Sequence, residues 1–339
     1  MLTFIAAVFV FGITVFVHEL GHFILARLSG IRVLELALGL GPKLVGFRRN
    51  EINYSLRIFP VGGYCRMLGE SPEEANEPNS FPSKPALHRA AVMAVGPSMN
   101  LLLALVILFV IFFFLVGTPR TDTTILGQVF KDSPAAAAGL QPGDTVISID
   151  AVPVHNWAEM VALIESRPDE TVAIVVRRDG EELEYAVQIE AVPEAGKGMI
   201  GVAAPVQKYR FAASLATSLE RFGDVILSMY HVITGQAPFD VIGPVGIIIT
   251  VGEVAQTGFI NLLWLMSLFN ISLGLLNLLP VPALDGGRLL FILVEAIRGR
   301  PLDPEKEALI HFIGFAVLMV LTLLVTYNDL LRWDIFPGR

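Results

Sequence analysis

The stretch FIAAVFVFGITVFVHELGHFILAR, residues 4–27, combines two properties that rarely occur together. Residues 4–17 carry no charge, and the whole stretch is long enough to cross the hydrocarbon core of a bilayer as a helix. His18, Glu19 and His22 nevertheless lie inside it. Because ionisable groups within a membrane are costly and usually functional, the stretch predicts both a transmembrane helix and a functional site.

The composition of the whole chain also favours a membrane protein. Of its 339 residues, 54% are hydrophobic and 17% are charged, whereas soluble domains have about 25% charged residues. Further uncharged stretches at 90–116, 254–284 and 308–328 each exceed the roughly 20 residues that a transmembrane helix needs. No basic segment precedes the first stretch, so we expect a helix there rather than a cleaved signal peptide. The prediction is a polytopic α-helical membrane protein with four transmembrane helices.

Basic residues predict the orientation of these helices. Residues 27–89 carry nine Lys or Arg, and residues 288–306 carry four. In a four-helix chain both loops lie on one side, which the positive-inside rule assigns to the cytoplasm. Both termini and the long connection between the second and third helices are then extracytoplasmic. The net charge of −8 argues against nucleic acid as a partner, and membrane lipid is the expected surrounding.

The long connection has the pattern of a small α+β domain. Residues 171–189 alternate as a hairpin with Asp179–Gly180 at the turn, and residues 156–166 have helical periodicity. SPAAAAGLQPGDTVISIDAVPV, residues 133–154, resembles the PDZ domains of bacterial envelope proteases. Such domains bind an extended peptide by strand addition, and ILGQVF, residues 125–130, is expected to face that peptide. A domain that restricts access only by its bulk is the alternative.

The polar residues of the opening stretch match a zinc motif. In a helix His18 and His22 share a face, so both imidazoles can bind one Zn²⁺ while Glu19 acts as general base. Zinc also needs a third protein ligand and an open position for water. Asp285 is the best candidate, because Pro280 and Pro282 must interrupt the helix before it and because its depth in the membrane matches that of the histidines. An ordinary helix-capping carboxylate is the alternative.

Several motifs together resemble the site-2 protease family of intramembrane zinc proteases, most closely its RseP-type bacterial members. They are HELGH (18–22), FPVGGYCRM (59–67), GPSMN (96–100), GPVGI (243–247), NLLPVPALDGG (277–287), EAIRGRP (295–301) and YNDLLR (327–332). The resemblance covers nearly the whole chain. It departs from the family in domain number, because many relatives carry two PDZ domains and this chain has room for one.

The resemblance implies a mechanism and a substrate class. Zinc is expected on His18, His22 and Asp285, with Glu19 as the catalytic base. The implied activity is endopeptidase cleavage by zinc-activated water, in regulated intramembrane proteolysis at the bacterial inner membrane, with the active site near the cytoplasmic side. Expected substrates are transmembrane segments of single-span proteins, such as anti-sigma factors, or signal-peptide remnants.

Four further residues are expected to bind substrate. Asn277 matches a family asparagine near the scissile bond, although a polar residue that packs helices is an equal alternative. Pro280 follows it in the same motif. Gly62 and Gly63 lie in a membrane-associated β element, residues 50–66, which in the family pairs with an extended substrate. Asn100 is expected to be structural.

These observations predict four parts. Residues 1–117 form an N-terminal membrane part with two helices and the β element, and 118–195 form the PDZ domain. Residues 196–258 form a linker with an interfacial amphipathic helix at 211–235, which anchors the chain or gates substrate, and 259–339 form a C-terminal membrane part.

Two other classes of function remain as alternatives. A metal ion transporter would also place His and Asp on broken membrane helices, and a catalytically inactive membrane scaffold would only present its PDZ domain. Glu19 distinguishes them, because neither needs a glutamate beside the first histidine. Cys65 is expected to be a buried or interfacial thiol. His88, His155, His231 and His311 have no partner at ligand spacing and receive no role.

Overall fold

A computed structural model describes residues 1–192, 196–236, 242–300 and 303–333. The chain divides into two compact units, which we call the membrane unit (Met1–Phe109 with Ser218–Arg339) and the insert domain (Val110–Thr217). Pro301, the last residue of the EAIRGRP motif, lies outside the described residues.

Within the described residues, four helices of the chain are long and apolar enough to cross a membrane. They are α1 (Leu2–Leu28), α2 (Ala86–Val110, continued by a π-helical turn, Ile111–Leu115), α7 (Phe259–Leu278) and α9 (Pro304–Arg332). The hydrocarbon core of a bilayer offers no hydrogen-bond partners, and a helix forms its backbone hydrogen bonds within itself. The predicted polytopic fold with four transmembrane helices is confirmed.

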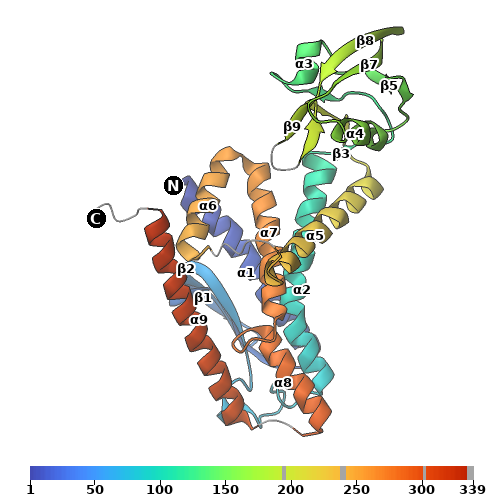
Figure 1. Cartoon of the computed structure of the whole chain (residues 1–339). Coiled ribbons are helices and arrows are strands. Elements are labelled where there is room, and N and C mark those ends of the chain that lie inside the picture. The colour runs from blue at the N-terminus through green and yellow to red at the C-terminus, as the bar shows by residue number, and fades with distance from the viewer. Residues whose placement is uncertain (193–195, 237–241, 301–302, 334–339) are drawn as a thin grey trace. The chain divides into compact units, whose positions relative to one another are not determined.

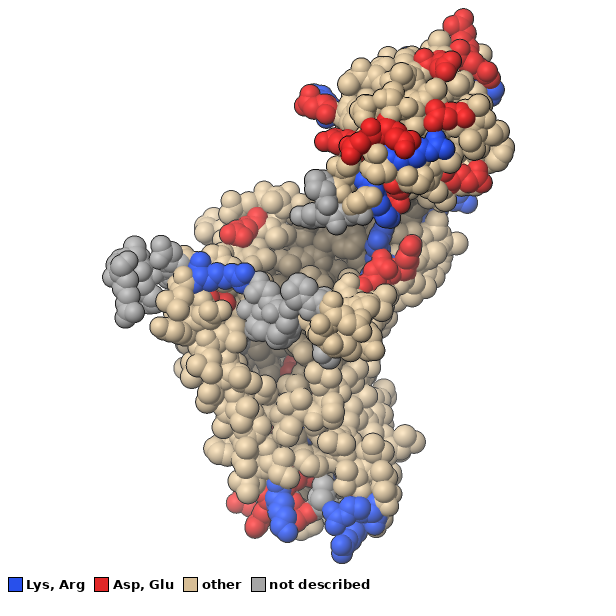
Figure 2. All heavy atoms as spheres, viewed as in Figure 1, with Lys and Arg blue, Asp and Glu red and all other residues tan. Residues whose placement is uncertain are grey.

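The ends of these helices alternate between the two ends of the membrane unit. α1 begins and α9 ends at one end, while α8 (Asp285–Arg298) ends and α9 begins at the other (Figure 1). Figure 2 shows charged side chains gathered where α8 ends and α9 begins, beyond a broad surface with few Lys, Arg, Asp or Glu. This distribution suits a protein that is surrounded by lipid along most of its length.

The predicted linker contains two helices, of which one was not predicted. Beside α5 (Phe211–Ile233), the linker contains α6 (Pro244–Thr257), an apolar helix of 14 residues that is too short to span a membrane. The uncharged run at 254–284 contains the end of α6 and all of α7, because Gly258, at φ +129°, separates the two helices. α7 begins at Phe259, the residue at which we expected the C-terminal membrane part to begin. An uncharged run alone does not show such a break.

A long antiparallel hairpin joins α1 to α2. It consists of β1 (Val33–Arg49) and β2 (Ile52–Met67), so the predicted β element at 50–66 is its second strand. Residues 35–38 of β1 pair with 63–66 on one side and with 53–56 on the other. β1 was not predicted, because two glycines with positive φ, Gly39 and Gly41, break its alternation.

The insert domain is an α+β domain with a single buried core. Its main sheet has the order β6 (Val152–Pro153), β5 (Thr145–Ile149), β7 (Thr171–Arg178), β8 (Glu181–Gln188), and its helices are α3 (Pro134–Ala138) and α4 (Trp157–Glu165). Positive φ at Asp179 and Gly180 forms the predicted hairpin turn. Side chains from α3, α4 and the sheet fill the core.

The insert domain extends further than predicted. Short strands pair across it: β9 (Glu190–Val192) with β10 (Lys197–Met199), β4 (Gln128–Val129) with β11 (Val202–Ala203), and β3 (Thr118–Pro119) with β12 (Val206–Gln207). The predicted end at 195 falls between two paired strands. Strands of two or three residues are too short to show an alternating pattern.

A groove of about 140 Å³ in the insert domain is lined by α4 and by residues 198–202. Residues 125–130, which we expected to face a peptide, do not line this groove, because β4 pairs with β11 instead.

Candidate metal centre

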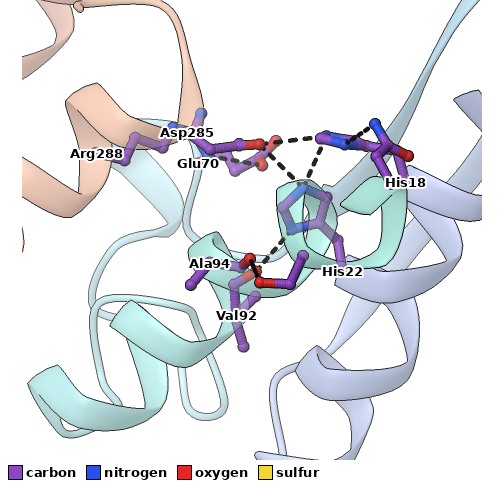
Figure 3. Close-up of polar contacts among 9 residues, drawn as sticks. His18, His22, Glu70, Val92, Ala94, Asp285 and Arg288 are labelled. Carbon is purple, nitrogen blue, oxygen red and sulfur yellow. Dashed lines mark hydrogen bonds and ion pairs between the residues drawn. The ribbon is translucent and has the colours of Figure 1, made fainter. Parts of the chain in front are cut away.

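Three predicted ligands converge on one point in the membrane unit. His18 and His22 are buried one turn apart on α1, with their Nε2 atoms 3.2 Å apart. Asp285, the first residue of α8, places Oδ2 3.2 Å from Nε2 of His18 and 3.4 Å from Nε2 of His22 (Figure 3). Within the described residues, this is the one cluster of His, Cys, Asp or Glu with the spacing of a metal site.

The separations of these three atoms fit zinc. Two atoms bound about 2.0–2.1 Å from one zinc ion at tetrahedral angles are about 3.3–3.4 Å apart. Nδ1 of His22 lies 2.7 Å from the backbone oxygen of Val92, which can only accept, so Nδ1 carries the proton and Nε2 presents a lone pair. A bound zinc ion would bring this lone pair, that of His18 and the carboxylate oxygen of Asp285 together.

Asn100 contacts the other histidine. Its side-chain amide lies 3.3 Å from Nδ1 of His18, and its Oδ1 is buried without a partner. If Nε2 of His18 binds the metal, Nδ1 of His18 carries the proton. The Asn100 side chain must then turn its amide oxygen toward this N–H group. A hydrogen bond of this kind fixes the tautomer and the orientation of a metal-binding imidazole. Asn100, which we expected to be structural, therefore contacts one of the predicted ligands.

Glycines make room for the histidines between α1 and α2. A Cβ atom on Gly96 would lie 2.2 Å from Nε2 of His22, and one on Gly21 would lie 3.1 Å from the backbone oxygen of Val95. Neither position accepts a side chain unless neighbouring atoms move, and at Gly96 these are the atoms of the His22 ring. The GPSMN motif thus supplies both the space for His22 and the amide beside His18.

The interrupted helix before Asp285 is observed as predicted. α7 ends at Leu278, and residues 279–284, which contain both prolines, lead to α8. A Cβ on Gly286 would lie 2.1 Å from the oxygen of Leu279, and one on Gly287 would lie 2.4 Å from the oxygen of Val281. The two glycines after Asp285 therefore let α8 fold back against the loop that precedes it.

Glu19 lies next to the predicted ligands. It is half-buried, and its carboxylate interacts electrostatically with His18, His22 and Asp285. The backbone N–H of Cys65 in β2 lies near enough to interact with it. Cys65 itself is a buried free thiol, as expected. The side chain beside the first histidine is thus held toward the same region as the metal ligands.

The four expected substrate-binding residues have different surroundings. Gly63 lies against α1, where a Cβ would be 2.8 Å from Val15 and 3.4 Å from Cγ of Glu19. Gly62 has φ +87° in β2, and the ring of Pro280 is exposed.

Asn277 is half-buried in the last turn of α7, and the structure gives its side chain no hydrogen-bond partner among the described residues. Of these four residues, Gly63 is the one that lies against Glu19.

Comparison with known proteins decides the family. A model of peptidase family M50 matches residues 6–321. The chain belongs to peptidase family M50. The regulator of sigma-W protease RasP of Bacillus subtilis is 34% identical over 97% of this chain and 98% of its own length. The zinc metalloprotease RasP of Geobacillus kaustophilus is 33% identical, over 97% and 98%.

Membership of family M50 confirms the predicted site-2 protease family. It also confirms the prediction of a membrane-bound zinc metalloprotease with Zn²⁺ as its cofactor. Among solved structures, the PDZ domain of an SdrC-like protein from Listeria monocytogenes is similar to part of the chain. It is 25% identical and covers 24% of this chain and 87% of its own, with a TM-score of 0.23.

Proposed function

We propose that this family M50 member is an intramembrane endopeptidase that cleaves membrane-spanning segments of single-span proteins or signal-peptide remnants. The position of Glu19 carries the proposal. Glu19 lies beside the proposed ligands His18 and His22 on α1, and its carboxylate interacts with a backbone N–H of β2. One ionisable group therefore lies between the metal ligands and the strand at which an extended peptide could pair.

The chemistry follows from this arrangement. Zinc, when bound, polarises water and lowers its pKa. Glu19 accepts the proton of the attacking water and delivers it to the leaving amine, as a positioned carboxylate does in general acid–base catalysis. We assign to Asn277 the binding of the substrate backbone or of the negative oxygen that develops on the attacked carbonyl. Its lack of a hydrogen-bond partner within the described chain supports this role.

The substrate must be extended before it is cut, because the carbonyls of a helix are already hydrogen-bonded. The backbone of β2 at Gly62 and Gly63 can supply replacement hydrogen bonds by strand addition. The backbone N–H of Cys65 points toward Glu19, and in a strand residue 63 directs its backbone groups to the same edge as residue 65. Pro280, at the start of the ligand loop, borders the same path.

The substrate class and location rest on the family. The Bacillus subtilis relative is named regulator of sigma-W protease RasP. A name that joins a sigma factor to a protease supports anti-sigma factors as substrates in regulated intramembrane proteolysis. We place the chain in the bacterial inner membrane, with both termini and the insert domain extracytoplasmic and the metal centre near the cytoplasmic side. The insert domain then selects substrates by bulk or by binding a peptide in the groove beside α4.

The test is the variant Glu19→Gln. Glutamine keeps the size of the side chain but accepts no proton at neutral pH, so cleavage of a reporter transmembrane helix should fall at least about 100-fold. Zinc content measured on the same sample should be unchanged, because the ligands remain. Glu253→Gln, at an exposed position of α6, is the matched control and should cleave normally. Full cleavage by Glu19→Gln would refute the mechanism, and zinc transport into liposomes that this variant leaves unchanged would favour a transporter.

A further inference from the structure

A histidine with no predicted role holds the loop that carries Asp285. His311 lies in α9, and its Nδ1 accepts a hydrogen bond of 2.9 Å from the backbone N–H of Ala283. Ala283 is two residues before Asp285 and has φ +76°, in the left-handed region. A non-glycine residue in that region is strained by about 1–3 kcal/mol and keeps its conformation only when its surroundings hold it.

The contact between α9 and this loop involves a second residue on the same helix face. A Cβ on Gly314, three residues after His311, would lie 2.5 Å from Cβ of Pro282 and 2.8 Å from its backbone oxygen. Residues three apart in a helix share a face, so His311 and Gly314 dock together. The backbone of α9 therefore approaches the loop as closely as van der Waals contact permits.

His311 also packs against the helix that Asp285 begins. Its ring lies edge-on to Phe291 of α8, with the ring centroids 5.2 Å apart and the planes inclined at 70°. Because Nδ1 accepts from Ala283, the proton of the neutral ring is on Nε2, and this atom is buried without a hydrogen-bond partner. One side chain thus contacts both the loop before Asp285 and the helix after it.

The loop's other backbone hydrogen bonds join it to itself or to its neighbouring helices. The N–H of Val281 donates to Leu279, that of Leu284 donates to Val281, and those of Gly287 and Arg288 donate to Leu284. The bond to His311 is the one among these that comes from a distant part of the chain. This bond fixes the backbone at Ala283, and the direction of the backbone there determines where the Asp285 carboxylate lies.

We propose that His311 is a positioning residue for the metal ligand Asp285, and that it acts by holding Ala283 in its left-handed conformation. The proposal rests on the ligand role proposed for Asp285. It makes α9 part of the support of the metal centre, although no residue of α9 belongs to the ligand set.

Three variants separate positioning from bulk. His311→Leu removes the acceptor, whereas His311→Asn retains one at the position of Nδ1. Thr322→Val is a control on the same helix, because the Thr322 hydroxyl donates only to Leu318 within α9. Adding Ala283→Gly to His311→Leu should partly restore the site, since glycine adopts positive φ without a side-chain penalty.

Two measurements on the purified full chain are decisive. The first is the rate at which a chelator removes zinc, and the second is hydrogen exchange of residues 279–287 in the metal-free protein. His311→Leu should lose zinc about 10–100-fold faster, the range found for groups that orient metal ligands, and its loop should exchange faster. His311→Asn and Thr322→Val should resemble the unmodified protein. Reporter cleavage by His311→Leu should fall in kcat rather than rise in KM.

Asp285→Ala, measured alongside, separates the two hypotheses. If Asp285→Ala retains zinc, its ligand role and the proposal for His311 are both wrong. If Asp285→Ala loses zinc while His311→Leu keeps normal zinc release and loop exchange, the positioning role alone is overturned. The positioning role is also overturned if His311→Asn loses zinc as fast as His311→Leu does.

Discussion

The insert domain and the membrane unit bury polar groups in opposite ways. In the insert domain the Asp144 side chain is 1% exposed, and its carboxylate accepts two hydrogen bonds of 2.6 Å from Arg178 and one of 2.9 Å from the N–H of Gln141. In the membrane unit the Nε2 atoms of His18 and His22 lie 3.2 Å apart and within 3.4 Å of Oδ2 of Asp285. The first cluster contains its own counter-ion, and the second has the geometry of a site for a metal cation.

This difference separates folding from function. A buried carboxylate that is paired and hydrogen-bonded maintains a domain, and removing its partners is costly. Side chains whose lone pairs converge stabilise nothing by themselves, so their arrangement must be maintained by neighbours such as Val92, Asn100 and His311. We therefore expect changes at the metal centre to affect zinc first, and changes at Asp144 to affect the insert domain and leave zinc unchanged.

The largest effect is expected from Gly96→Ala. A methyl group there would lie 2.2 Å from Nε2 of His22, so the ring must move and the ligand triangle open. We expect zinc binding and reporter cleavage to be lost, with an overpacking cost of roughly 1–3 kcal/mol. Gly12→Ala is the control, because no atom lies within 4 Å of a Cβ on Gly12. Normal zinc content in Gly96→Ala would contradict the proposed packing at His22.

Asp144→Ala should destabilise the insert domain by roughly 1–3 kcal/mol, because it removes the buried acceptor of the hydrogen bonds from Arg178 and from the N–H of Gln141. Hydrogen exchange of β7 in the full chain measures this cost. Zinc content and cleavage of a short reporter helix should not change. Arg177→Ala is the control, since Arg177 forms an exposed ion pair with Glu182 that contributes little. Loss of zinc in Asp144→Ala would show that the two units depend on each other.

The pH dependence of the same residue sharpens the comparison. Burial opposes ionisation of Asp144, but hydrogen bonds from Arg178 and from the N–H of Gln141 hold the pKa of its carboxyl below the ordinary value. Asp in an unfolded chain titrates near about pH 3.9. Asp144 therefore adds stability above that pH, and this stability is lost as the pH falls through the lower folded pKa. Asp144→Asn should flatten this part of the stability curve, and an unchanged curve would contradict the assignment.

The smallest effect is expected from Asp329→Ala. The Asp329 carboxylate is buried near the end of α9 and accepts hydrogen bonds from the N–H groups of Gly243 (3.0 Å) and Gly246 (2.8 Å). It therefore caps the beginning of α6, and its loss should cost about 1–2 kcal/mol. Hydrogen exchange of residues 243–247 should increase, while Asp303→Ala, at the cap of α9 itself, should leave these residues unchanged. Equal exchange in both variants would refute the cap.

Local patterns in the sequence were sufficient for much of this molecule. Uncharged length predicts the four helices, and helical spacing places His18 and His22 on one face. Two prolines predict the break before Asp285, and Asp179–Gly180 predicts a hairpin turn. In each case the physical cause lies within a few residues of its effect.

Contacts between distant residues could not be predicted in this way. The role of Asn100 depends on a histidine 82 positions away, and that of Gly96 depends on the space that His22 occupies. His311 contacts a loop 28 positions earlier. Strands such as β11 and β12 are defined by partners near the start of the insert domain, so their own residues show no pattern.

X-ray absorption at the zinc edge of the purified protein tests the central claim most directly, because it reports the ligands themselves. We expect about one zinc per chain, with nitrogen and oxygen atoms at about 2.0–2.1 Å and the scattering pattern of two imidazoles. A sulfur atom at about 2.3 Å, or a first shell without two imidazoles, would contradict binding of zinc by His18, His22 and Asp285.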